Sequence, residues 1–265
     1  MKTKSPRPPK TRRNPGRVSG RNTRPVAICV LTYGDYPQLA RRCLDSIFKH
    51  CDRSLYRLVV GANEVGARTK RYLQRLHQCG AIDRLILSPV NLHKCPMMRC
   101  MFKGLTNEFV WWFDDDSHVI EKTALTRRLE QARMDSPEVV IWGGLYLTNH
   151  IGVSWGNGDA VPFVRTASWY RGLTPPFWAP GGKGEFDFQG RSTGDGHWNF
   201  VPGGNWFIRS AALRQLDWPD RRLRILADDV LLCEAVRQQG WRLGNISDCG
   251  VVVSDASRRW VEANG

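Results

Sequence analysis

Residues 109–116 read FVWWFDDD, a run of five apolar residues followed by three aspartates. The apolar run has the length and composition of a strand that is covered on both faces in a parallel sheet. Ligands of open α/β sheets bind outside the carboxyl ends of the strands, which is where the aspartates fall. Adjacent carboxylates repel one another, so a cation is their natural partner. The stretch therefore predicts a buried strand that ends at a ligand-binding site.

The spacing of the aspartates indicates which cation would bind there. In an extended segment Asp114 and Asp116 point to the same side. Hard oxygen ligands at that spacing suit Mn²⁺ or Mg²⁺ held jointly with a phosphate. The alternative is an acidic loop that only caps the next helix.

The residues before this stretch alternate between strand and helix patterns. Residues 26–32 (VAICVLT) form a near-continuous apolar run, and a helix follows in which Asp35 is the expected cap and Pro37 fits the first turn. The next elements are expected as strands at 56–60 and 84–87 and helices at 68–78 and 96–103. Such alternation predicts a right-handed, doubly wound α/β sheet.

The sequence changes character after Trp142. Residues 143–206 contain 14 glycines and five tryptophans with little helical period. Long irregular loops carry function more often than regular elements do, although each tryptophan taken alone fits a core position. A helix is expected again at 228–239, ended by Gly240, and an apolar strand at 250–254.

Three further segments hold candidate site residues. Asp228 and Asp229 open the late helix, where acidic residues are common caps but also suit a general base beside a metal-bound nucleotide. Residues 31–35 (LTYGD) offer a turn, an aromatic face and a carboxylate at the sheet edge. In residues 202–207 (PGGNWF) the paired glycines allow close backbone approach, and Asn205 can hydrogen-bond a polar ligand.

These four motifs, in this order, resemble the family 2 glycosyltransferases of the GT-A fold over residues 26–253. The likeness implies a doubly wound, mostly parallel sheet with a Rossmann-like nucleotide-sugar half at 26–142. An irregular, Gly- and Trp-rich acceptor half would follow at 143–257. Outside this single domain, we expect a disordered basic arm at 1–25 and a C-terminal tail at 258–265.

The likeness also implies roles for individual residues. Asp229 would be the general base, with Asp228 beside it. The family often completes its metal site with a late histidine, which Asp255 would replace here. The family also has an aspartate that touches the nucleoside, which Asn63 or Glu64 would replace. The implied nucleotide-binding residues are Thr32, Tyr33, Asp35, Asn63, Glu64, Arg99, Asp114 and Asp115. Either Arg99 or Lys94 would add positive charge near the nucleotide. The implied metal ligands are Asp114, Asp116 and Asp255. The implied acceptor-binding residues are Gly203, Gly204, Asn205 and Trp206.

Net charge bears on the acceptor. The chain has 39 Lys and Arg against 25 Asp and Glu, a formal charge of +14. Nine of those cations, and no acid, lie in residues 1–25, which have too few apolar side chains to fold alone. Such an arm attracts polyanions through counterion release, and a basic helix at 68–78 extends that surface. Nucleic acid is the simplest polyanion, although anionic lipid or a ribosome also fits.

The expected reaction is inverting transfer of a sugar from a nucleoside diphosphate, taken as a UDP-sugar, with Mn²⁺ or Mg²⁺. The expected acceptor is a hydroxymethylated pyrimidine, 5-hydroxymethylcytosine, in DNA, as for some phage enzymes. One alternative acceptor is a cell-envelope polysaccharide or a lipid-linked sugar. Two alternatives of other classes are a two-metal nuclease or nucleotidyl transferase built from Asp114, Asp116 and Asp229, and a non-catalytic nucleic-acid-binding module.

Composition narrows the class of protein further. No stretch approaches 18 consecutive apolar residues and no secretory signal is visible, so we expect a cytoplasmic protein. Eight scattered cysteines are typical of reduced, mostly buried thiols. The pair Cys95 and Cys100 lacks the second pair that a structural zinc site needs.

Overall fold

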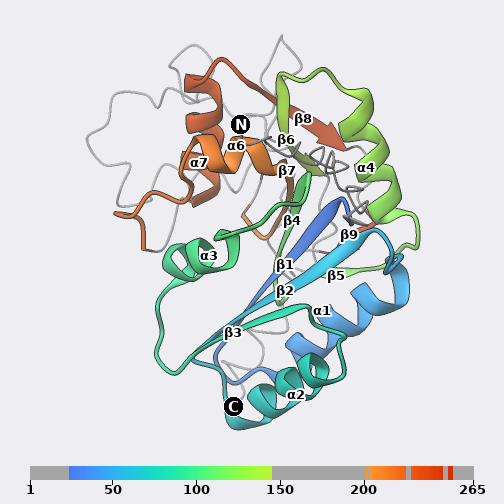
Figure 1. Ribbon diagram of the computed structural model, residues 1–265, viewed down its shortest axis with the longest axis vertical. Helices are drawn as coiled ribbons and strands as arrows, with labels where there is room; N and C mark the ends of the chain where they lie inside the picture. The colour runs from blue at the N-terminus through green and yellow to red at the C-terminus, as the bar shows by residue number, and fades with distance from the viewer. Residues whose placement is uncertain (1–23, 145–200, 202, 225–227, 247–249, 253–265) are drawn as a thin grey trace, which may run out of the picture.

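The structure, a computed structural model, describes residues 24–144, 201, 203–224, 228–246 and 250–252. These residues form a seven-stranded sheet in the order β3-β2-β1-β4-β7-β6-β8 and a small sheet of β5 and β9 (Figure 1). The strands of the large sheet are β1 (Val26–Tyr33), β2 (Tyr56–Asn63), β3 (Arg84–Ser88), β4 (Phe109–Asp114), β6 (Val139–Gly144), β7 (Asn205–Arg209) and β8 (Arg242–Ile246). The small sheet joins β5 (His118–Val119) to β9 (Val251–Val252).

Helices cover both faces of the large sheet (Figure 1). Side chains alternate between the faces of each strand, so Ile28 and Val30 of β1 belong to one apolar core and Ala27 and Cys29 to the other. The first core is closed by α1 (Pro37–His50), α2 (Ala67–Gln78) and α4 (Ala124–Met134). The second is closed by α3 (Lys94–Phe102), α6 (Ser210–Gln215) and α7 (Asp228–Gln238).

The prediction of a doubly wound, mostly parallel sheet is confirmed. Strand β1 pairs in parallel with both β2 and β4, and β2 with β3. Strand β7 is an addition to that prediction, because it runs antiparallel between β4 and β6 in a segment expected to be irregular. Its side chains Trp206, Phe207 and Ile208 are all buried, alternately in the two cores. This short apolar run was not predicted as a strand, because the neighbouring glycines and tryptophans indicated a loop.

The start of α1 and the end of α7 can be compared with the capping residues expected from the sequence. Pro37 occupies the first position of α1, as predicted, but Asp35 is not its cap: the N-cap residue is Tyr36, and no side chain caps the helix. The carboxylate of Asp35 instead lies against Gly66, where a Cβ would fall 1.9 Å from Asp35 Oδ1. Gly240 ends α7 with a φ of +74°, as expected for a glycine C-cap.

One cation of the expected basic arm contacts the folded residues. Arg24 belongs to the folded body, since its Nη1 lies 2.8 Å from Asp83 Oδ1 and its carbonyl accepts a hydrogen bond from Asn107. Asp83 also accepts hydrogen bonds from Arg53 Nη2 at 2.6 Å and from the Leu58 amide at 2.7 Å. The other eight cations of the predicted arm lie outside the described residues.

We expect Asp83→Asn to lower the free energy of unfolding by about 2 kcal/mol at pH 7 and by much less at pH 3. Burial opposes ionisation of Asp83, but the hydrogen bonds from Leu58 and Arg53 outweigh it and hold its pKa below the ordinary value of 3.8. A lowered folded-state pKa means stability that is present above pH 3.8 and lost as the pH falls through the folded value. Urea denaturation at both pH values measures the effect. The exposed Glu130→Gln is the control, and a loss that does not depend on pH would contradict the prediction.

Seven cysteines are described, all of them free thiols. Five are buried, whereas Cys79 and Cys100 are exposed. Burial raises the pKa of the Cys95 thiol to about 12, so this thiol stays protonated at neutral pH. The described part of the chain contains no helix with the length and apolarity needed to cross a bilayer.

Candidate active site

A cavity of about 260 Å³ opens where β1, β2 and β4 end, the edge at which the sequence predicts a ligand site. We call it the edge cavity. Its lining residues are Leu31, Tyr33, Asn63, Asn91, His93, Lys94, Asp114 and Asp115. Tyr33 is 40% exposed and presents an aromatic ring, and Asp114 and Asp115 supply negative charge. A cavity that combines an aromatic ring with several polar side chains is suited to a small polar ligand with a flat ring.

A buried ammonium group lies among the carboxylates of this site. Lys94 Nζ is 3.1 Å from Asp114 Oδ2 and 3.2 Å from Asp228 Oδ2, and it donates a hydrogen bond to the Gly203 carbonyl at 3.0 Å. Burial disfavours the charged amine, but Asp114, Asp228 and Asp229 outweigh burial and raise the pKa of Lys94 well above its ordinary value. Lys94 is therefore a permanent cation of this cluster.

Asp229 is tied to the same cluster through the backbone. The Gly203 amide donates a hydrogen bond to Asp229 Oδ2 at 2.9 Å, while the carbonyl of Gly203 accepts the bond from Lys94. Asp229 is only partly buried, in the first turn of α7, whereas the adjacent Asp228 is 6% exposed. One carboxylate thus faces inward to the ammonium, and the next stays accessible to solvent.

The described residues supply suitable oxygen ligands for a divalent metal ion, but not a complete set. Both oxygens of Asp114 accept hydrogen bonds, from Trp112 Nε1 at 3.1 Å and from Lys94 Nζ. Asp115 Oδ2 accepts one from the Tyr33 amide at 3.2 Å. Among the residues placed by the structure, no three metal-ligating side chains gather. Asp116 and Asp114 have the oxygen chemistry that Mn²⁺ and Mg²⁺ prefer, and the expected third ligand, Asp255, lies outside the described residues.

Solved structures with the same architecture exist. Mannosyltransferase PcManGT from Pyrobaculum calidifontis, in complex with GDP-Man and Mn²⁺, superposes with a TM-score of 0.58 at 17% identity, over 85% of this chain and 55% of that one. TarS from S. aureus superposes with a TM-score of 0.55 at 14% identity, over 89% of this chain and 38% of that one. TarS 1-349 from S. aureus, in complex with UDP, superposes with a TM-score of 0.55 at 15% identity, over 87% of this chain and 60% of that one.

The fold is that of the GT-A glycosyltransferases. This chain spans about two fifths to three fifths of the length of these neighbours. No protein-family model and no curated protein matches the sequence.

The fold brings half of the eight predicted nucleotide-binding residues to the edge cavity. These are Tyr33, Asn63, Asp114 and Asp115. Thr32 is fully buried, and its hydroxyl donates to the Gly61 carbonyl at 3.2 Å, so this side chain joins two strands. Asp35 and Glu64 are exposed at the ends of β1 and β2 and do not line the edge cavity.

Arg99 does not join the nucleotide-binding group with which the sequence analysis placed it. It lies near the other end of α3 from Lys94, where its Nη2 contacts both oxygens of Asp217 at 2.9 and 3.0 Å. Its Nη1 donates to the carbonyls of Asp217 and Pro219. These contacts hold the turn after α6, so Arg99 has a structural partner far along the chain that its sequence context could not reveal.

The expected acceptor loop divides into two parts. Gly203 and Gly204 are at the site, since the Gly204 carbonyl accepts a hydrogen bond from the Asp114 amide at 3.0 Å. Asn205 and Trp206 are instead buried in β7. Asn205 Nδ2 donates to the Trp112 carbonyl at 2.9 Å and its Oδ1 accepts from Trp111 Nε1 at 3.1 Å. The Trp206 ring stacks on that of Trp112, with 5.7 Å between centroids.

Asn205→Ala should lower the free energy of unfolding by about 2 kcal/mol, because it leaves the Trp112 carbonyl and the Trp111 indole without their partner inside the fold. Urea denaturation measures this loss. Gln215→Ala, an exposed amide on α6, is the matched control. An Asn205→Ala protein with full stability and impaired acceptor binding would support the original assignment.

The predicted site lacked three residues of the edge cavity, Leu31, Asn91 and His93, and it included Lys94 only as an alternative to Arg99. Asn91 accepts a hydrogen bond from Asn63 Nδ2 at 2.9 Å and caps the His93 amide at 2.8 Å. His93 has a φ of +67°, an uncommon conformation for a residue with a side chain. The sequence signal for this turn was the set of polar residues Asn91, His93 and Lys94 between a strand and a helix.

Proposed function

We propose that this protein is a metal-dependent inverting glycosyltransferase, which moves a sugar from a nucleoside diphosphate sugar to an acceptor hydroxyl. The observation that carries the proposal is the cluster in which Lys94 and Gly203 connect Asp114, in the edge cavity, to Asp229 at the start of α7. A group for the donor diphosphate and a base for the acceptor thereby lie in one connected site. That arrangement is what a single displacement at the anomeric carbon requires.

Each residue of the cluster has a task in this proposal. Asp229 takes the proton of the acceptor hydroxyl as its oxygen attacks the anomeric carbon. The Gly203 amide orients that carboxylate, and Lys94 adds positive charge near the departing diphosphate. Asp116 and Asp114 would hold the divalent ion, which when bound neutralises charge on the leaving group.

The donor is proposed to be a UDP-sugar. Support comes from the edge cavity, where the Tyr33 ring can stack on a nucleobase and Asn63 lies in the wall. Two of the neighbours with this fold were solved with GDP-Man and Mn²⁺ or with UDP. A nuclease or nucleotidyl transferase built from the same aspartates has no comparable support.

The acceptor is proposed to be 5-hydroxymethylcytosine in DNA. The support is electrostatic: the formal charge is +14, and eight cations lie in residues 1–23 without one acid. Four exposed cations on α2, Arg68, Lys70, Arg71 and Arg75, add to this charge. Charge of this kind concentrates the protein on a polyanion without regard to its sequence.

Incubation with a panel of nucleotide sugars tests the function. Each donor is mixed with Mn²⁺ and with one of four acceptors: plain DNA, hydroxymethylcytosine-containing DNA, a polysaccharide or a lipid-linked sugar. Mass spectrometry then measures the digested nucleosides or the recovered glycan. We expect a gain of one sugar mass on hydroxymethylcytosine alone. A gain of mass on polysaccharide or lipid-linked sugar, with none on DNA, would support the proposed glycosyl transfer but overturn DNA as the acceptor. No transfer to any acceptor would overturn both the proposed reaction and the proposed acceptor.

A further inference from the structure

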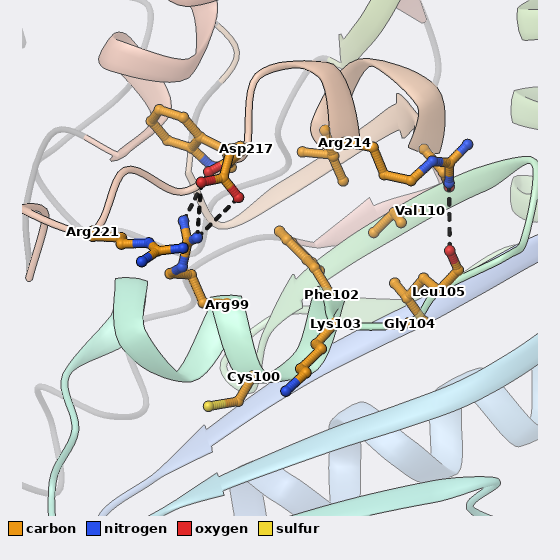
Figure 2. A pocket seen from close by; sticks show the side chains of 13 residues that line it. Arg99, Cys100, Phe102, Lys103, Gly104, Leu105, Val110, Arg214, Asp217 and Arg221 are labelled. Atoms are coloured by element: carbon orange, nitrogen blue, oxygen red, sulfur yellow. Dashed lines mark hydrogen bonds and ion pairs between the residues drawn. The ribbon is translucent and has the colours of Figure 1, made fainter.

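A second cavity, of about 520 Å³, lies at the C-terminal end of α3 (Figure 2). Its walls come from the end of α3, the turn before β4, α6 and the turn after α6. It shares no lining residue with the edge cavity, which meets the first turn of the same helix. A nine-residue helix is about 13 Å long, so the two cavities are separate sites. We call this one the α3–α6 cavity.

The α3–α6 cavity is strongly basic. Four cations line it, Arg99, Lys103, Arg214 and Arg221, against the single carboxylate of Asp217. Asp217 neutralises Arg99 through two short contacts (Figure 2). The other three cations are exposed, and none of them pairs with a carboxylate within the described part of the chain. Arg214 makes only a long hydrogen bond, 3.4 Å, to the Leu105 carbonyl.

The wall behind these cations is apolar. It is formed by the side chains of Phe102, Leu105, Val110, Leu213 and Trp218. Two buried polar atoms of the wall, Ser210 Oγ and Trp218 Nε1, have no hydrogen-bond partner among the residues that the structure describes. Buried polar groups are almost always paired with protein, water or ligand. The α3–α6 cavity thus combines unneutralised positive charge, apolar surface and unused hydrogen-bonding capacity.

We propose that the α3–α6 cavity binds a nucleotide, with its phosphate at the exposed cations and its base and sugar against the apolar wall. Lysine and arginine are the side chains that proteins use for phosphate, and the three exposed cations of this cavity have no carboxylate partner within the described part of the chain. The volume falls within the range of about 300–1,000 Å³ found for small-ligand sites. The nucleotide is either free or one unit of a polynucleotide, since both present the same chemistry. The site is distinct from the transfer site proposed above and does not depend on it.

Cys100 is a built-in reporter of occupancy, because this exposed thiol lines the α3–α6 cavity (Figure 2). Cys79 is the internal control, an exposed thiol at the end of α2, which covers the opposite face of the sheet. The full-length protein is alkylated with iodoacetamide, and both cysteines are followed by peptide mass spectrometry. The probes are thymidine monophosphate, a short oligothymidylate, and thymidine, which lacks the phosphate.

We expect the phosphate-bearing probes to slow alkylation of Cys100 by about fivefold at a concentration of about four times Kd, and thymidine to have no effect. If both phosphate-bearing probes protect Cys100, the cavity binds a free nucleotide. If only the oligonucleotide protects it, the cavity binds a polynucleotide. Cys79 should react at the same rate throughout. Protection should weaken with added salt.

Two matched double variants separate the cavity from general electrostatics. Lys103→Glu with Arg221→Glu should abolish protection of Cys100. Lys49→Glu with Lys122→Glu, at exposed positions in α1 and in the turn before α4, removes the same charge and should preserve protection. Absence of protection in the natural protein overturns the proposal. Equal protection of Cys79 and Cys100, or protection that survives Lys103→Glu with Arg221→Glu, also overturns it.

Discussion

Asp229→Asn should lower the rate of sugar transfer by about 10³-fold, the usual contribution of a general base, and leave donor binding unchanged. Asparagine has the shape of aspartate, and its Oδ1 can still accept the hydrogen bond that the Gly203 amide donates at 2.9 Å. It cannot take a proton from the acceptor hydroxyl. The variant therefore removes the chemical role of Asp229 and keeps its structural one.

Two measurements separate these roles. Transfer is followed with the donor and acceptor identified by the panel, and donor binding by the thermal shift on adding UDP and Mn²⁺. Asp45→Asn, an exposed carboxylate on α1, is the control and should keep both properties. An unchanged transfer rate in Asp229→Asn would refute the assignment of the base, and loss of donor binding together with transfer would show that Asp229 belongs to the donor site.

Lys94→Met should lower the free energy of unfolding by about 3 kcal/mol, because it leaves partly or fully buried carboxylates without their cation. Lys94 Nζ lies within 3.2 Å of Asp114 and Asp228, whose side chains are only 25% and 9% exposed. Methionine keeps most of the volume of the lysine stem, so the loss measures charge and hydrogen bonding more than packing. Urea denaturation at pH 7 gives the value.

A double-mutant cycle tests whether this loss comes from the charge cluster. Adding Asp228→Asn to Lys94→Met removes one of the stranded carboxylates and should restore part of the lost stability. Lys70→Met on the exposed face of α2 is the control and should change stability by less than about 0.5 kcal/mol. Additive losses in the double variant would mean that Lys94 and Asp228 are not coupled.

The regular elements of the first half could be predicted because their signals are local. Strand β4 was expected at 109–113 and spans Phe109–Asp114, and α2 was expected at 68–78 and spans Ala67–Gln78. In each case an apolar run or a periodic face lies within one short window of the chain. Strand β7 escaped the same reasoning, because its five residues follow a long segment whose composition indicated a loop.

The site was predictable only where a strand end placed it. Asp114 ends β4, Asp115 follows it and Tyr33 ends β1, so a parallel sheet brings them to one edge. Lys94 and Gly203 are 109 residues apart and meet only through folding. Asn205, which looks equally polar in sequence, is buried between two tryptophans of β4.

The sequence by itself determined the order of strands and helices in the first half, the end of β4 at three aspartates, and the excess of positive charge. Hydrophobic period and residue charge are properties of the chain, and they need no knowledge of which segments meet. Only the tertiary structure decided that an ammonium lies among the carboxylates, that Arg99 supports a turn, and that three cations surround a second cavity. The role of a polar side chain depends on its burial and its partners, and distant segments supply both.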